Sequence, residues 1–222
     1  MSDTDDARAL VPGAMDRVTA RVRAVGAGIW RAPTPCTEWA VRDLVSHLCF
    51  EHLWAPHVLA GTTMGEVGDR YDGDLLHADP PGAWERAVAR SRPTWAATGT
   101  HAARVHTIFG WIRVEEYAEQ MLLDLTVHEW DLARGAGLDE ELDPVGVERA
   151  LTYIRRDPVM LTGQGLWRPP VAPSSDEPRD VLLALLGRQV QMTPLEPPPT
   201  PVPCERPGPP GAPTPRRAGS ES

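Results

Sequence analysis

The chain has 222 residues, of which 41% are hydrophobic and 24% charged, so it has enough apolar material for one folded domain with some chain left over. Its formal net charge of −9 argues against a partner recognised through phosphates, so we expect no nucleic-acid binding. It contains no apolar run long enough to span a membrane, and its acidic N-terminus is unlike a signal peptide. We therefore expect a cytoplasmic protein with no membrane association.

The cysteines and a bias in residue composition indicate the state of the thiols and the kind of source organism. Cys36, Cys49 and Cys204 cannot all pair and show no CxxC spacing, so we expect reduced thiols, with a structural role for Cys36. The chain contains no Lys and no Asn, a bias typical of GC-rich coding that hints at an actinobacterial source.

Helical periodicity recurs along most of the chain. It predicts helices over Asp3–Val25, Glu38–Leu59, Pro81–Ala97, Val114–Arg134, Pro144–Arg156 and Arg179–Leu186. We expect Thr37 to cap the second of these, Pro93 to kink the third, and Gly135 and Gly137 to end the fourth.

The remaining segments separate into a short extended piece and a tail. Residues 103–112 are rich in β-branched and aromatic side chains, which favours a brief strand or an extended connection. The last thirty residues hold eleven of the 24 prolines and have no apolar face, so we expect a disordered or polyproline-like tail over 193–222. Because no alternation of strands and helices appears, the predicted fold class is mainly α, a helical bundle with a short irregular C-terminal annex.

Three polar residues have a spacing that suits a metal ion. Asp124 and His128 stand four residues apart in a predicted helix, so they share one face, and its apolar neighbours make an unpaired carboxylate costly. His47 lies toward the core side of the second predicted helix and can supply a third ligand. Two imidazoles and a carboxylate suit Zn²⁺, Fe²⁺ or Ni²⁺ and leave coordination positions open for water or substrate. A structural Asp–His hydrogen bond is the alternative.

Other polar residues of these helices have less specific interpretations. Glu51 is aligned with His47 and either accepts a hydrogen bond that orients its imidazole or pairs with a neighbouring Arg. His52 and His57 rotate away from His47, which predicts solvated or interfacial side chains. Asp43 fits a favourable position in the first turn of its helix, and Asp131 is placed where it can orient a ligating imidazole. Most of the eight tryptophans are assigned to core packing.

Common catalytic signatures are absent from the sequence. It contains no GxSxG, Walker loop, GxGxxG or HExxH, which removes the usual hydrolase, nucleotide-triphosphatase, dinucleotide and zincin interpretations.

Three segments taken together resemble a known family. They are TPCTEWAVRDLVSHL over 34–48, DLTVHEWDLAR over 124–134, and DVLLALLGR over 180–188. The paired TPCxxWxVxDLxxHL and HxWDLA signatures resemble the mycothiol-dependent maleylpyruvate isomerase-like branch of the DinB superfamily, over about Ala7 to Arg188.

The resemblance implies a DinB-like four-helix bundle that holds a divalent metal, usually zinc, through His47, Asp124 and His128. In the isomerase the middle ligand is typically Glu, whereas this chain has Asp, which is one methylene shorter. The region after Gly137 is shorter than the isomerase's substrate-binding domain, and the substrate-binding Arg of that domain has no assigned counterpart here. The implied division is a metal-binding bundle over 1–138, a helical annex over 139–192 and the tail over 193–222.

The expected function follows from this resemblance. A metal with open positions lowers the pKa of a bound thiol, so a cosubstrate thiol supplies the nucleophile without a catalytic Cys. We expect mycothiol, a low-molecular-weight thiol, as the cosubstrate. The expected reaction is S-transfer to, or isomerisation of, a small electrophile by a monomer or homodimer. Zinc is the expected metal, with nickel or iron as alternatives. The rival hypothesis is a non-catalytic module of the same fold that binds a metal or small ligand in a regulatory role.

Overall fold

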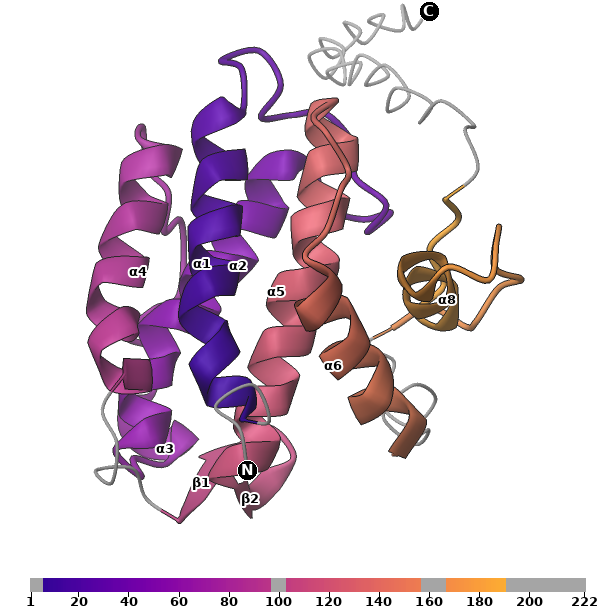
Figure 1. The fold of residues 1–222 in the computed structure, drawn as a ribbon. Coiled ribbons are helices and arrows are strands. Elements are labelled where there is room, and N and C mark those ends of the chain that lie inside the picture. Colours follow the sequence, from indigo (N-terminus) through magenta and orange to yellow (C-terminus); the bar gives the residue numbers. More distant parts are fainter. Residues whose placement is uncertain (1–5, 97–102, 157–166, 191–222) are drawn as a thin grey trace, which may run out of the picture.

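A computed structural model of the chain describes residues 6–96, 103–156 and 167–190 (Figure 1). Its elements are α1 (Ala7–Ala24), α2 (Val41–Leu59), α3 (Met64–Val67), α4 (Pro80–Ala96), β1 (Arg104–Thr107), β2 (Gly110–Arg113), α5 (Val114–Ala136), α6 (Pro144–Arg156) and α8 (Pro178–Leu185). The predicted mainly α fold class is confirmed, and each predicted helix is present, Pro144–Arg156 with the predicted bounds and the others with one or both ends shifted.

Four long helices, α1, α2, α4 and α5, form the bundle, and Figure 1 shows them side by side. Helix α1 packs against α4 and α5, and α2 packs against the same two helices, so the four elements enclose one core. The core is built from the apolar stripe of each helix, including Val18 of α1, Leu48 of α2, Trp84 of α4 and Leu125 of α5. Burial of these stripes stabilises the helices more than their intrinsic propensity does.

Helix α5 belongs to two hydrophobic clusters. Its Leu125 face points into the bundle, whereas Leu123, Val127 and Trp130 pack against α6 and α8 in a second cluster. Polar contacts reinforce both faces, since buried Glu129 pairs with Arg17 of α1 at 3.1 Å and Glu119 accepts from Arg149 Nε of α6 at 3.0 Å. The helix is therefore fixed in position from both sides.

The N-terminus of α2 differs from the prediction. The helix begins at Val41 rather than Glu38, and its N-cap is Ala40, so the expected capping role of Thr37 was wrong. The cause is an isolated bridge between Pro33 and Ala40, which holds the intervening residues in a closed loop. Asp43 lies in the first turn as predicted, and its Oδ2 accepts a hydrogen bond from the Ala40 N–H at 3.0 Å.

The C-terminus of α5 also lies beyond its predicted end. Gly135 is still helical, and Gly137 provides the cap with a left-handed φ of 65°. A side chain at Gly135 would place Cβ 2.9 Å from Thr34 Cγ2 and 3.0 Å from the carbonyl oxygen of Pro33. Gly135 therefore lets the loop over 33–40 lie directly on α5.

The segment over 103–112 forms a hairpin, which confirms the prediction of a brief strand and adds a second one. Strands β1 and β2 pair antiparallel, with Val105 opposite Ile112 and Thr107 opposite Gly110. Gly110 has a φ of 84°, as the tight turn requires. Ile108 is 64% exposed and Trp111 49% exposed, so the hairpin presents apolar side chains to solvent.

Two expectations concern residues or boundaries that the structure does not test. The predicted tail over 193–222, with Cys204, lies outside the described residues. The division into 1–138 and 139–192 stays a prediction. Among the described helices, none has the length and apolar character needed to cross a membrane.

Candidate metal centre

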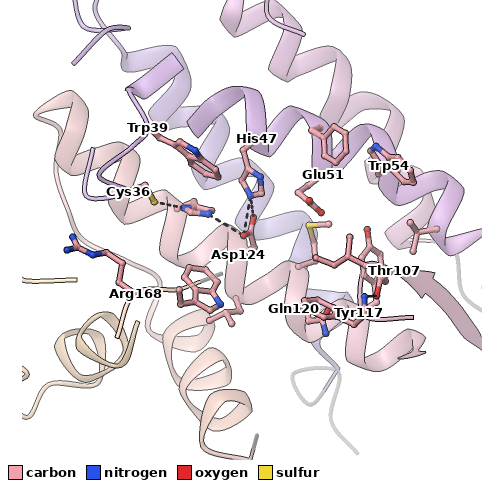
Figure 2. Close-up of a pocket in the computed structure, with 18 of the residues that line it drawn as sticks. Cys36, Trp39, His47, Glu51, Trp54, Thr107, Tyr117, Gln120, Asp124 and Arg168 are labelled. Atoms are coloured by element: carbon pink, nitrogen blue, oxygen red, sulfur yellow. Dashed lines mark hydrogen bonds and ion pairs between the residues drawn. The ribbon is translucent and has the colours of Figure 1, made fainter. Parts of the chain in front are cut away.

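The three predicted ligands come together between α2 and α5. The Nε2 atom of His47 lies 3.3 Å from Asp124 Oδ2, and the Nε2 atom of His128 lies 3.3 Å from Asp124 Oδ1. One ligand atom from each of the three residues lies within 4.8 Å of the other two. Figure 2 shows His47 of α2 and Asp124 of α5 pointing toward one another across the cavity.

The spacing of the donor atoms fits a tetrahedral ion. Zinc bonds to nitrogen and oxygen of about 2.0–2.1 Å place neighbouring donor atoms about 3.3–3.4 Å apart at tetrahedral angles. The Oδ1 atom of Asp124 lies 3.4 Å from His47 Nε2 and 3.3 Å from His128 Nε2, and both distances match that value. The shorter Asp124 thus reaches both imidazoles although the resemblance implied a Glu at this position.

Asp124 carries a buried oxygen that needs a partner. Its Oδ2 atom is inaccessible to solvent and makes no hydrogen bond of acceptable geometry among the described residues. Burial alone would raise the pKa of this carboxyl, but the charges of His128 and His47 outweigh burial and lower it. An ionised carboxylate with an unsatisfied oxygen between two imidazole nitrogens is a typical environment for a cation.

The opposite nitrogen of His128 is already engaged. Its Nδ1 lies 2.9 Å from Asp131 Oδ2, as the sequence suggested for Asp131. This contact favours a proton on Nδ1 and leaves Nε2 free as a ligand, the usual arrangement of a metal-binding histidine. Without a metal, burial opposes the charged form of His128, but Asp124 and Asp131 together raise its pKa well above the ordinary value.

A buried polar network holds Asp131 in place. Arg188, which follows α8, donates from its terminal nitrogen to Asp131 Oδ2 at 2.7 Å and from Nε to Oδ1 at 3.3 Å. The thiol of Cys36 also donates to Asp131 Oδ2 at 3.2 Å. Burial would raise the pKa of Asp131, but Arg188 and His128 lower it, so the carboxylate stays charged. Cys36 thus contributes to the positioning of His128, in keeping with its predicted structural role.

Cys36, His128 and Asp131 form a second group with metal-ligand spacing. This group is less suited to a cation, because both oxygens of Asp131 already accept hydrogen bonds and the Arg188 guanidinium lies 3.1 Å from the Cys36 sulfur. A metal ion there would sit beside a fixed positive charge. Among the described residues, the set of His47, Asp124 and His128 is therefore the better candidate.

The ligands border a cavity of about 710 Å³. That volume lies within the usual range for small-molecule sites. Trp39 and Trp167 flank the centre, with ring centroids 5.9 Å and 5.8 Å from the His128 ring. Trp39 comes from the loop over 33–40, so the close approach allowed by Gly135 also positions this wall of the cavity. Any ion held by the triad would face the cavity on one side.

Glu51 lines the same cavity, and Figure 2 shows it beside His47 and Asp124. Neither predicted partner is found, since Glu51 makes no hydrogen bond or ion pair with His47, an Arg or any other described residue. Burial is the main cause that raises its pKa to about 7, and the charge of Asp124 adds to this while His47 opposes it. Glu51 is thus a carboxyl group free to meet a ligand in the cavity.

The solvated position predicted as one alternative is wrong for His52, which is buried, whereas His57 is partly exposed. His52 is 0% exposed, and its Nδ1 lies 3.0 Å from Ser91 Oγ of α4. His57 is partly exposed and contacts the hydroxyl of Tyr71 at 2.7 Å. His52 continues the buried stripe that includes Leu48 and Ala55, and this apolar periodicity was the signal for its burial.

Sequence reasoning missed two parts of the site. Arg188 was not assigned a role, and the contact of Trp167 with the centre was not foreseen. Both residues belong to the annex and are far from the ligands in sequence, so only tertiary packing brings them to the cavity. Trp111, in contrast, does not pack in a core, because it is 49% exposed.

The fold and site define a helical-bundle protein with a candidate metal centre beside a ligand-sized cavity. Residues 11–133 match the family described as the mycothiol maleylpyruvate isomerase N-terminal domain, and because the match covers more than half of the chain, the protein belongs to this family. The match includes all three candidate ligands and ends before Arg188.

Two curated proteins of Mycobacterium tuberculosis are also similar to this chain. They are the uncharacterized protein MT0763 of strain CDC 1551 / Oshkosh and the uncharacterized protein Rv0738 of strain ATCC 25618 / H37Rv. Each is 28% identical over 190 residues, which cover 80% of this chain and 95% of the relative. The similarity therefore extends past the bundle into the annex. No solved structure matches the chain.

Proposed function

We propose that this protein is a metal-dependent enzyme that uses a low-molecular-weight thiol, mycothiol by family, for S-transfer to or isomerisation of a small electrophile. The observation that carries the proposal is the Asp124 carboxylate, which lies between two imidazole Nε2 atoms on the wall of a cavity and has a buried, unsatisfied Oδ2. Family membership supports the thiol, and the donor set supports zinc as the metal.

His47, Asp124 and His128 would hold the ion, and three protein ligands leave a coordination position for a substrate group. A divalent ion bound there lowers the pKa of a coordinated thiol, so that a thiolate exists at neutral pH. Asp131 fixes the His128 ring through Nδ1, and Arg188 keeps Asp131 ionised. Trp39 and Trp167 restrict water around the centre.

The bond changes in such a reaction are simple. The thiol sulfur forms a bond to an electrophilic carbon, and the electron pair goes either to a leaving group or to a carbonyl oxygen conjugated with that carbon. The first outcome is S-transfer. In the second, rotation about the former double bond and expulsion of the thiol complete an isomerisation. The three cysteines of the chain have no part in either route.

Zinc titration of the metal-free full chain tests the ligand assignment. We expect about one zinc ion per chain for the wild type and loss of stoichiometric binding in His47→Ala, Asp124→Asn and His128→Ala. His77→Ala is the matched control, because His77 is exposed and lies outside the cavity. Zinc at 1,000 times its Kd should stabilise the wild type by about 4 kcal/mol. An unchanged zinc stoichiometry in all three variants would contradict the assignment of these residues as metal ligands.

Thiol access is tested on the cobalt-substituted protein. A low-molecular-weight thiol is expected to change the cobalt absorption spectrum, whereas the corresponding alcohol leaves it unchanged. A metallated protein whose spectrum does not respond to thiol would contradict the enzyme proposal. That result would favour the rival hypothesis of a metal- or ligand-binding module with a regulatory role.

A further inference from the structure

The cavity extends from the candidate metal centre toward the β-hairpin, and this part has its own chemical character. We call it the hairpin arm. It is lined by Phe50, Trp54, Val58, Met64, Ile108 and Phe109. Figure 2 shows Trp54 and Thr107 on one side of His47 and Asp124, with Cys36 and Arg168 on the other side. The candidate metal centre thus lies between the hairpin arm and the annex.

Aromatic rings and flexible apolar side chains form the walls of the hairpin arm. The rings of Phe50 and Trp54 lie 5.5 Å apart, and Trp54 also contacts Tyr71 at 6.5 Å, which fixes its orientation. Ile108, at the hairpin turn, is 64% exposed. Exposed apolar surface at the edge of a cavity gains stabilisation when a ligand covers it.

The charges of the cavity are distributed unevenly. The two arginines that line it, Arg168 and Arg188, lie toward the annex, and Arg188 is already paired with Asp131. Glu51 lies beside Asp124 on the side of the hairpin arm (Figure 2), and the described residues that line this arm include no Arg. A second carboxylate placed there would be repelled.

The histidine of the hairpin already has a partner in the fold. The Nδ1 atom of His106 accepts a hydrogen bond from the Met64 N–H at 3.4 Å. Because both lining arginines lie toward the annex, the described residues of the hairpin arm include no Arg to hold a carboxylate.

We propose that the electrophile is a neutral molecule with an aromatic or branched apolar group, which occupies the hairpin arm and directs its reactive carbon toward the candidate metal centre. A small dicarboxylate is not the ligand that this arm fits. The proposal rests on the proposed function, because it names the substrate class of that site. It extends that function because it assigns recognition of the apolar group of the electrophile to Trp54 and Phe109.

Calorimetric titration with two unreactive ligands tests the substrate class. The probes are 4-phenyl-2-butanone, a neutral aromatic ketone, and succinate, a small dicarboxylate; neither reacts with a thiol. The zinc-loaded full chain, without any thiol, is expected to bind the ketone at least about tenfold more tightly than succinate, because only the ketone covers the apolar walls. Equal or tighter binding of succinate, or no binding of the ketone, would overturn the proposal.

Two variants locate the bound ketone. Phe109→Ala and Trp54→Ala are each expected to weaken ketone binding by about tenfold, since each removes an aromatic wall. Trp111→Ala is the matched control, because Trp111 is on the same hairpin but does not line the cavity. Phe109 is partly exposed at the hairpin turn, so its replacement should leave the bundle folded even if Trp54→Ala does not. Unchanged affinity in a folded Phe109→Ala variant would contradict the assignment.

The binding test separates this proposal from the proposed function. Binding of the ketone needs neither thiol nor turnover. A protein that binds the ketone but does not respond to thiol would therefore contradict the enzyme proposal and still support the apolar ligand class. A protein that responds to thiol and binds succinate preferentially would keep the enzyme and refute the apolar substrate class.

Discussion

Two buried histidines, in two regions of the molecule, show opposite electrostatics. His128 on α5 lies between Asp124 and Asp131, and these carboxylates raise its pKa well above the usual value despite burial. His52 on α2 lies in the bundle core beside Ser91, and there burial lowers the pKa to about 4. The two pKa values thus shift in opposite directions, because burial prevails at His52 whereas the carboxylates beside His128 outweigh it.

The comparison explains why one region suits chemistry and the other suits stability. The region around His128 holds ion-paired groups beside a cavity, whereas His52 contacts the neutral Ser91 hydroxyl within an apolar core, and Trp95 donates to the same hydroxyl. Buried charges are costly unless paired, so they persist mainly where they serve a ligand or an orientation. The next three predictions test this difference.

The largest effect is expected from Arg188→Met. The substitution leaves the fully buried carboxylate of Asp131 without its cation, and we expect the free energy of unfolding to fall by about 3–5 kcal/mol. Urea unfolding followed by circular dichroism measures the change. In the control, Arg23→Met breaks an exposed ion pair with Glu85 and should cost less than about 1 kcal/mol. Equal losses in both variants would mean that the network around His128 is not held by Arg188.

A pH-dependent effect of intermediate size is expected from His52. The unfolded chain protonates this imidazole near pH 6.5, whereas the folded chain does so only near pH 4, so the unfolded state binds more protons between these values. His52 therefore lowers the free energy of unfolding as the pH falls from 6.5 to 4, by at most about 3 kcal/mol, and not above pH 6.5.

Urea unfolding between pH 4 and 8 tests this sign. His52→Gln should lose this share of the acid sensitivity, whereas exposed His77→Gln should retain the wild-type pH dependence. An identical slope in wild type and His52→Gln would show that His52 is not held neutral by the core.

The smallest effect is expected from Ser91→Ala. The Ser91 hydroxyl contacts His52 Nδ1 at 3.0 Å and accepts from Trp95 Nε1 at 2.9 Å, so its removal leaves two buried groups without this partner. We expect a loss of about 1–3 kcal/mol in thermal or urea unfolding. Ser46→Ala on the partly exposed side of α2 should change stability by less than about 0.5 kcal/mol. A loss no larger than that of the control would show that the hydrogen bonds of Ser91 do not stabilise the core.

The sequence predicted what depends on short spacing. The helices followed from apolar periodicity, and the convergence of Asp124 with His128 followed from their separation of four residues. His47 required the further assumption that α2 and α5 face one another, which the structure shows.

The features that were missed depend on contacts between distant residues. Asp131 and Arg188 are 57 positions apart, and Cys36 and Asp131 are 95 apart, so no local pattern signals the network. The burial of His52 was missed for a different reason. Its position around the helix axis was compared with that of His47 and not with the buried apolar stripe of α2. The early start predicted for α2 failed because a bridge between Pro33 and Ala40 competes with helix formation.

The position of Arg188 has a consequence for the order in which the chain can mature. During synthesis, all three candidate ligands leave the ribosome before the annex does. Asp131 also emerges before Arg188, its partner 57 residues later in the chain. A nascent bundle thus holds a buried acid without its counterion and an α5 surface still lacking α6 and α8. The contact that holds Asp131, and through it the His128 ring, can therefore form only once α8 has docked and brought Arg188 to Asp131.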